Sequence, residues 1–218
     1  MSNLKEILIN KKICKSVWFM RQAGRYLPEF REIRNKNPNF IKLCLDSELC
    51  SIITIQPVKR FNVDSAIIFS DILMVPYALG QDVKFIKNYG PNLDDFNFKN
   101  FMNNNEGEFK KKLSPVYKAI EITRKKLNKE KSLISFVGAP WTLLVYMLGI
   151  KKSKNDLDLK KLDNKDINFD EIFNQLIKYL CIHIKCQIDS GADVVQIFDS
   201  WAGKLPNNKL MQFCLKPN

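Results

Sequence analysis

Four short apolar segments, each followed directly by polar, charged or glycine residues, limit the possible folds of this chain more than any other feature. They run from Val17 to Met20, Ser65 to Phe69, Ser132 to Val137 and Asp193 to Phe198. Almost continuous apolar runs of this length are typical of parallel strands that are covered on both faces. The carboxyl ends of such strands carry the chemistry of α/β folds, so the residues that follow are candidates for a functional site.

Stretches with helical spacing separate these segments. The expected helices cover residues 29–35, 46–59, 114–128, 169–189 and 209–215. Pro28 suits a first helical turn, Asp46 or Ser47 can cap the second helix, and Gly191 can end the fourth. The alternation predicts an α/β fold with a parallel sheet. The polar tracts 97–112 and 151–168 are expected to be surface loops of one domain that spans residues 1–218.

The length of the chain sets a limit on this fold. A (β/α)8 barrel takes about 250 residues, whereas this chain has 218 residues and shows four strands. If the fold is a barrel, only about its first half is present. An open parallel edge with exposed apolar faces favours aggregation. We therefore expect residues 1–218 alone to be poorly soluble and inactive. Addition of the missing half should restore both solubility and activity.

The net charge of +12 raises the question of a nucleic-acid partner. Most lysines lie in polar tracts and are expected on a solvated surface, and neither a nucleic-acid motif nor basic residues interleaved with aromatic ones are present. No apolar stretch approaches the roughly 20 residues of a membrane-spanning helix, and no apolar signal region follows the N-terminus. The sequence thus predicts a cytoplasmic protein without a nucleic-acid or membrane partner.

The cysteines and the single histidine point away from a metal centre. The six cysteines are Cys14, Cys44, Cys50, Cys181, Cys186 and Cys214, and no two of them form a C-x-x-C pair. In a chain of this size they are expected to be reduced and mostly buried thiols. His183 lies in an apolar helical stretch, where a buried histidine with a satisfied hydrogen bond is the simplest interpretation. One such histidine makes neither a histidine-based metal site nor a Ser-His-Asp triad.

Arginine is distributed very differently from lysine. Only six arginines are present, and four of them lie between positions 21 and 34. Arginine binds carboxylates and phosphates in a planar, bidentate manner, so a chain rich in lysine that keeps arginine here is expected to bind an anion. Gly24 lies between Arg21 and Arg25 and lets a ligand approach the backbone closely. The alternative is that these arginines pair with Glu29, Glu32 and aspartates elsewhere.

The run MRQAGRYLPE, residues 20–29, resembles the signature of the uroporphyrinogen decarboxylase family. Three further segments support the resemblance and follow in the family's order. They are FSDILMVPYALG at 69–80, GAPWTLLVYMLG at 138–149 and GADVVQIFDSWAG at 191–203. The resemblance implies a TIM barrel, usually in a cytosolic or plastidic homodimer. It further implies a carboxy-lyase that, without metal or organic cofactor, converts the four acetate groups of uroporphyrinogen III to methyls, giving coproporphyrinogen III.

The same resemblance implies roles for particular residues. The substrate-binding set is Arg21, Gln22, Ala23, Gly24, Arg25, Arg34, Asp71, Phe136, Tyr146 and Ser200. The arginines and Ala23 would hold substrate carboxylates, as would Tyr146 and Ser200, while Phe136 would line the cleft. Asp71 would accept hydrogen bonds from the pyrrole N–H groups. The implied catalytic residues are Asp71, Arg21 and Arg25.

These residue types suit the implied chemistry. Uroporphyrinogen carries eight carboxylates, and arginine provides a cationic rim that does not lose its proton. Protonation of a pyrrole α-carbon gives a cationic ring that withdraws electrons from the departing carboxylate. A buried carboxylate such as Asp71 would stabilise this charge. Because the substrate itself accepts the electrons, no cofactor motif is required.

Several alternatives stay open. Asp71 and Ser200 can instead cap turns, and Tyr146 can be a core residue. The related corrinoid methyltransferases share the barrel but typically bind zinc through His and Cys, and no H-x-C arrangement is present. An inactive fragment or a tetrapyrrole-binding remnant is a third possibility. The chain also departs from the family in two places: it has no match to the family's C-terminal histidine, and after Gly149 it reads IKKSK where a Gly-Ser-Lys element is usual.

Overall fold

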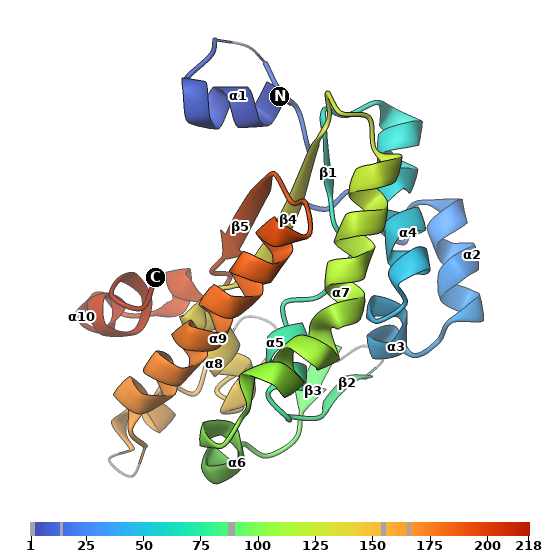
Figure 1. Cartoon of the computed structure of the whole chain (residues 1–218). Helices are drawn as coiled ribbons and strands as arrows, with labels where there is room; N and C mark the ends of the chain where they lie inside the picture. The colour runs from blue at the N-terminus through green and yellow to red at the C-terminus, as the bar shows by residue number, and fades with distance from the viewer. Residues whose placement is uncertain (1–2, 14, 87–89, 154–155, 165–166) are drawn as a thin grey trace. The chain divides into compact units, whose positions relative to one another are not determined.

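The computed structural model describes residues 3–13, 15–86, 90–153, 156–164 and 167–218. The chain divides into two compact units. The first comprises Met1–Asp71, Leu113–Phe136 and Ile184–Gln196, and the second comprises Ile72–Lys112, Val137–His183 and Ile197–Asn218. Strands β1 (Ser65–Ile67), β4 (Ser132–Gly138) and β5 (Val194–Phe198) form one sheet in the order β1-β4-β5 (Figure 1).

The strands of this sheet are parallel. Ser65 lies opposite Ser132, and Ile67 lies opposite Ile134, in a parallel β1–β4 pair. The N–H of Asp193 donates to the carbonyl of Leu133 at 2.8 Å, and the N–H of Ala139 donates to that of Phe198 at 2.9 Å. Residue numbers therefore rise together along β4 and β5. The predicted α/β class with a parallel sheet, and three of the four predicted strands, are confirmed.

The fourth predicted strand, Val17 to Met20, is wrong. Val17 exchanges hydrogen bonds with Asp64, whose carboxylate accepts from the Val17 N–H at 2.7 Å and whose N–H donates to the Val17 carbonyl at 2.9 Å. No ladder continues from this pair in the described residues. Val17, Phe19 and Met20 are 53–56% exposed. An apolar run alone does not make a strand where further backbone partners are missing.

The first unit contains the helices that surround the start of the sheet. They are α1 (Asn3–Asn10), α2 (Pro28–Lys36), α3 (Phe40–Cys44) and α4 (Ser47–Phe61), with parts of α7 (Glu106–Lys126) and α9 (Phe169–Asp189). Pro28 occupies the first turn of α2, and the Asp46 carboxylate accepts from the Leu49 N–H at 2.9 Å to cap α4. Both predicted helix starts are confirmed.

A hydrophobic cluster binds strands β1 and β4 to α4 and α7 in this unit. Its buried members are Cys50, Val58, Val63, Ala66, Ile68, Ala119, Ile120, Leu127, Leu133 and Ala192. Removal of apolar surface from water contributes about 25 cal/mol per Å², so such a cluster is a main source of stability. It fixes β1, and with β1 the position of the residues that follow it.

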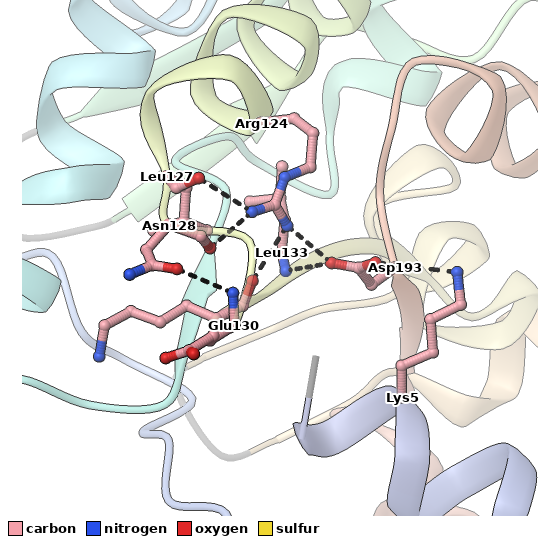
Figure 2. A network of polar contacts seen from close by, with 8 residues as sticks. Lys5, Arg124, Leu127, Asn128, Glu130, Leu133 and Asp193 are labelled. Carbon is pink, nitrogen blue, oxygen red and sulfur yellow. Dashed lines mark hydrogen bonds and ion pairs between the residues drawn. The ribbon is translucent and has the colours of Figure 1, made fainter. Parts of the chain in front are cut away.

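A network of charged and backbone groups lies at the amino ends of β4 and β5 (Figure 2). The Arg124 guanidinium donates to Asp193 Oδ2 at 2.8 Å and to three backbone carbonyls at 2.8–3.1 Å. The same carboxylate oxygen accepts from the Leu133 N–H at 2.9 Å, and Lys5 Nζ lies 3.8 Å from the other oxygen. The network joins the end of α7 to both strands.

The second unit contains a small antiparallel sheet that the sequence did not predict. Its strands are β2 (Val83–Ile86) and β3 (Gly90–Leu93), with Val83 opposite Leu93 and Ile86 opposite Gly90. The other elements are α5 (Met74–Ala78), α6 (Phe98–Met102), α8 (Pro140–Met147), the 3-10 helices η1 (Leu159–Asp163) and η2 (Ala202–Lys204), α10 (Asn207–Leu210) and the π-helix η3 (Met211–Leu215). The helix expected at 209–215 is thus present in two parts.

The tract 97–112, expected to be a loop, is largely helical. It forms α6 and the first part of α7, which begins at Glu106 rather than at Ser114. Asn105 Oδ1 accepts from the N–H groups of Gly107 and Glu108 at 2.8 and 3.2 Å and satisfies the start of this helix. Phe101 and Phe109 are buried, which supplies the apolar face that a packed helix needs. The tract 151–168 contains η1, and residues 154–155 and 165–166 lie outside the described part.

Strand β5 is less buried than expected. Ile197 is 44% exposed and the other residues of β5 are half-buried, whereas β4 is buried almost throughout. Edge position alone does not explain the difference, because β1 lies at the other edge of the sheet and is buried throughout.

His183 lies within α9 and is 4% exposed, with its ring edge-on to Phe109 at 6.4 Å. Burial lowers its pKa to about 3, so the imidazole is neutral near pH 7. The interpretation of His183 as a buried residue on a helix is confirmed. The five described cysteines are free thiols, and Cys14 lies outside the described residues. Among the helices that the structure describes, none has the length and apolar character needed to cross a bilayer.

Candidate functional site

Gln22 anchors the arginine-rich segment in the first unit. Its side chain is 2% exposed, and Nε2 donates to the carbonyl of Ser65, the first residue of β1, at 2.8 Å. The Tyr26 hydroxyl donates to the Gln22 carbonyl. With Gln22 held from both sides, Arg21 and Arg25 on either side of it remain exposed. The fold therefore presents two guanidinium groups to solvent from one anchored turn.

The carboxylates nearest in sequence are bound by other cations. Arg60 donates to both oxygens of Glu29, at 3.0 and 2.9 Å, and Lys36 donates to Glu32 at 2.8 Å. Among the described residues, the ion-pair partners of Glu29 and Glu32 are thus Arg60 and Lys36 rather than the four clustered arginines, although the charge of Arg31 contributes to the lowered pKa of Glu29.

Gly24 and Ala23 are half-buried between the two exposed arginines. A Cβ placed on Gly24 would lie 3.5 Å from the Tyr26 ring, which is an ordinary van der Waals distance. The fold itself thus accommodates alanine at position 24. Any requirement for glycine here must come from something outside the chain that approaches the backbone.

Arg34 and Asp71 both act on the same buried thiol. The Arg34 guanidinium lies 5.6 Å from the centre of the Phe40 ring and donates to the Asn37 carbonyl at 2.5 Å. Burial raises the pKa of Cys44, the charge of Asp71 raises it further, and the charge of Arg34 opposes this. The charges of Arg34 and Asp71 therefore both influence the Cys44 thiol, at the end of α3.

The backbone that leads from β1 to Asp71 is held by α4 and by aromatic contacts. The Phe69 N–H donates to Thr54 Oγ1 at 2.8 Å. The Phe69 ring meets Phe30 and Phe40 at 5.7 and 5.9 Å, in edge-to-face geometry. Phe136, half-buried on β4, packs against the same hydrophobic cluster as Phe69. Asp71 follows this fixed strand end and is half-buried.

Tyr146 and Ser200 belong to the second unit, where Trp201 lies next to both. The Tyr146 ring meets the Trp201 ring at 6.3 Å, and Lys151 Nζ lies 5.7 Å from the Tyr146 ring centre. Ser200 precedes Trp201 and is exposed. The Thr142 hydroxyl accepts from the Trp201 N–H at 3.2 Å and donates to Asp199 Oδ1 at 2.7 Å. Asp199 also accepts from Cys214 Sγ at 3.0 Å, so its carboxylate makes structural contacts at the end of β5.

Sequence reasoning missed Cys44, Thr54 and Thr142. A hydroxyl residue within an apolar helical run is the only signal that the sequence offers for the two threonines. Cys44 is expected from the sequence only as a buried thiol, because the influence of Asp71 and Arg34 on it depends on how α3 packs. Within the described residues, no three His, Cys, Asp or Glu side chains lie close enough to hold a metal ion.

Comparison with solved structures identifies a shared fold. A methyltransferase from Methanosarcina mazei matches with a TM-score of 0.74 and 16% identity, over 100% of this chain and 65% of that protein. At this identity the match shows the fold alone.

Comparison with protein families identifies the family. The sequence pattern of the family described as uroporphyrinogen decarboxylase (URO-D) matches residues 14–218. The chain therefore belongs to the uroporphyrinogen decarboxylase family.

Named relatives agree with this assignment. The uroporphyrinogen decarboxylase of Orientia tsutsugamushi (strain Ikeda) is 45% identical over 209 residues, which is 92% of this chain and 59% of the relative. That of Rickettsia bellii (strain RML369-C) is 43% identical over 204 residues, with the same two coverages. The chain thus spans about 59% of the length of these relatives.

Proposed function

We propose that the protein containing this chain decarboxylates uroporphyrinogen III to coproporphyrinogen III, in porphyrin and haem biosynthesis. Each of the four acetate side chains loses carbon dioxide and becomes a methyl group. The observation that carries the proposal is the family match over residues 14–218, which includes every proposed site residue. The site residues and their roles are part of this proposal.

The proposed architecture is a (β/α)8 barrel, of which residues 1–218 form about the first half as one domain. The three-stranded parallel sheet supports it, because its strands β1, β4 and β5 are neighbours in the order in which they occur along the chain. So does the fold likeness to the methyltransferase, which adds no second candidate function. The family resemblance also suggests a homodimer for the full-length protein, and the free thiols suit a cytoplasmic location.

Arg21, Arg25 and Arg34 are the proposed carboxylate-binding residues. Arg21 and Arg25 are exposed, and the neighbouring acids Glu29 and Glu32 are already bound by Arg60 and Lys36. The guanidinium groups stay protonated and need not be released from these acids before they bind the carboxylates of a substrate. Gln22, Ala23 and Gly24 would hold the backbone of this turn against the substrate.

Asp71 is the proposed partner of the pyrrole ring. Protonation of a pyrrole α-carbon makes the ring cationic, and its N–H groups then donate more strongly to a carboxylate. The electrons of the C–CO2 bond flow into this ring as carbon dioxide leaves. The resulting methylene carbon takes up a proton to become a methyl group, and the α-carbon returns its proton. A fixed carboxylate stabilises the positive charge where it develops.

The remaining residues would shape the site. Phe136 would line the cleft, and Tyr146 and Ser200 would bind substrate carboxylates. Ser200 is exposed at the end of β5, and the Tyr146 ring on α8 packs on Trp201, the residue that follows Ser200.

The arginine rim is tested by exchanging one arginine in the full-length protein. Arg25→Ala should lower kcat/KM for uroporphyrinogen III at least tenfold, which corresponds to about 1.4 kcal/mol of transition-state binding. Lys110→Ala is the control, because Lys110 forms an exposed pair with Glu106 on α7 and should matter little. Equal losses from both variants would mean diffuse charge attraction and would contradict the proposed rim.

A further inference from the structure

Two buried threonines bind backbone N–H groups next to proposed site residues. Thr54 is 1% exposed on α4, and its hydroxyl donates to the Cys50 carbonyl at 2.6 Å while it accepts from the Phe69 N–H at 2.8 Å. Phe69 lies two residues before Asp71. The hydroxyl thus uses both its donor and an acceptor site, and one of the two bonds crosses from a helix to the end of a strand.

Thr142 makes the corresponding pair of bonds in the second unit. It is fully buried on α8, donates to Asp199 Oδ1 at 2.7 Å and accepts from the Trp201 N–H at 3.2 Å. Trp201 directly follows Ser200, and Tyr146 packs against the Trp201 ring. Each unit therefore has one threonine hydroxyl at the strand end that carries its proposed site residues.

The Thr54 bond holds the backbone just after β1, on the side that faces away from β4. The N–H of Ile68 donates to the carbonyl of Ile134 on β4 at 2.9 Å. Because the N–H groups of successive residues in a strand point to opposite sides, that of Phe69 points away from β4, and it donates to Thr54. A buried N–H without a partner costs about 1–3 kcal/mol, so the hydroxyl selects one backbone path after β1. That path sets the direction in which Asp71 leaves the strand.

A third buried threonine provides an internal comparison. Thr123 on α7 is fully buried and donates to the Ala119 carbonyl at 2.7 Å, the same i−4 bond that Thr54 makes within its helix. Its described bond stays within α7. Thr54 and Thr123 thus differ in the bond to a strand end rather than in burial or local helix chemistry.

We propose that Thr54 and Thr142 are positioning residues, whose hydroxyls fix the strand ends that carry Asp71 and Ser200. The proposal rests on the decarboxylase function proposed above. Removal of either hydroxyl should leave substrate recognition by the arginines largely intact, because Arg21 and Arg25 are held through Gln22 and Ser65. For Thr54 the loss should therefore fall on kcat rather than on KM. For Thr142, which positions the proposed carboxylate-binding residue Ser200, KM should rise as well.

The test compares valine and serine variants of the full-length protein with Thr123→Val. Thr54→Val should lower kcat for uroporphyrinogen III at least tenfold, with KM within about twofold of its original value. Thr142→Val should lower kcat/KM at least tenfold. Thr54→Ser should recover kcat, and Thr142→Ser should recover kcat/KM, to within about threefold. Thr123→Val should leave both constants within twofold. Equal kcat values for Thr54→Val and Thr123→Val would overturn the proposal for Thr54.

Amide hydrogen exchange separates this proposal from the proposed function. Thr54→Val should speed exchange at the Phe69 amide, and Thr142→Val at the Trp201 amide, each at least tenfold, whereas Thr123→Val should change neither. If the unaltered protein does not act on uroporphyrinogen, the proposed function fails and exchange alone decides the positioning role. Unchanged exchange at Phe69 and Trp201 in the valine variants would then overturn it. Thermal unfolding of each variant identifies any general loss of structure.

Discussion

At the scale of single residues, the fold and the proposed reaction make different demands on the arginine-rich turn. The fold needs Gln22, which is buried and bound to Ser65. It does not need Gly24, where a Cβ fits at 3.5 Å from Tyr26. Arg21 and Arg25 are exposed, so the fold leaves them accessible for the binding role proposed above.

Gly24→Ala therefore separates folding from binding. Because a methyl group fits within the chain, the free energy of unfolding should change by less than about 1 kcal/mol. The same methyl group should raise KM for uroporphyrinogen III at least fivefold, if substrate carboxylates approach this backbone. Urea unfolding and steady-state kinetics measure the two effects. A KM that stays unchanged would show that the substrate does not approach residue 24.

His183 gives the protein a defined response to acid. Burial lowers its pKa from 6.5 to about 3 in the folded chain, so the unfolded chain binds the additional proton between these pH values. Its contribution to stability is therefore present above pH 6.5 and is lost progressively as the pH falls towards 3. The slope cannot exceed one proton, or about 1.4 kcal/mol per pH unit. Urea unfolding measures the free energy of unfolding at pH 7 and at pH 4.5. The difference between these two free energies should be smaller for His183→Leu than for the original protein, and an equal difference would contradict the neutral histidine.

At the scale of elements, the network around Arg124 and Asp193 fastens α7 to the amino ends of β4 and β5 (Figure 2). Chemistry in parallel α/β folds lies at the opposite, carboxyl ends, so this network is expected to serve stability. Arg124→Met should lower the free energy of unfolding by about 2–4 kcal/mol, because it removes the ion pair with Asp193 and the donor of three backbone carbonyls. KM for uroporphyrinogen III should stay within twofold. A stable protein with a raised KM would assign Arg124 to substrate binding instead.

The elements that could be predicted from the sequence are those with a strong local pattern. β4 is a buried apolar run, α4 has the Asp46 cap, and α9 shows regular helical spacing. The start of α7 was missed because the Asn105 cap is hidden in a polar tract, and the pair β2–β3 because its strands are only four residues long. The segment 17–20 was misjudged because strand formation needs partners along its whole length.

At the scale of the whole molecule, the sequence predicts some features of the proposed site and misses others, as it does for the elements. The identities of the proposed binding residues followed from motifs that are continuous in sequence, such as residues 20–29. The contacts that hold those residues did not. Thr54 to Phe69, and Arg34 with Asp71 around Cys44, join residues far apart in the chain, and only the packed helices bring them together.

The most direct measurement is the stoichiometry of carbon dioxide released from uroporphyrinogen III by the full-length protein, compared with its Asp71→Asn variant. Asparagine keeps the size of the side chain and removes its charge. We predict four molecules of carbon dioxide for each coproporphyrinogen III formed by the unaltered protein. We further predict a turnover at least a hundredfold lower for Asp71→Asn, about 2.7 kcal/mol, with an unchanged circular dichroism spectrum. No release by the unaltered protein, or equal turnover by both, would contradict the account.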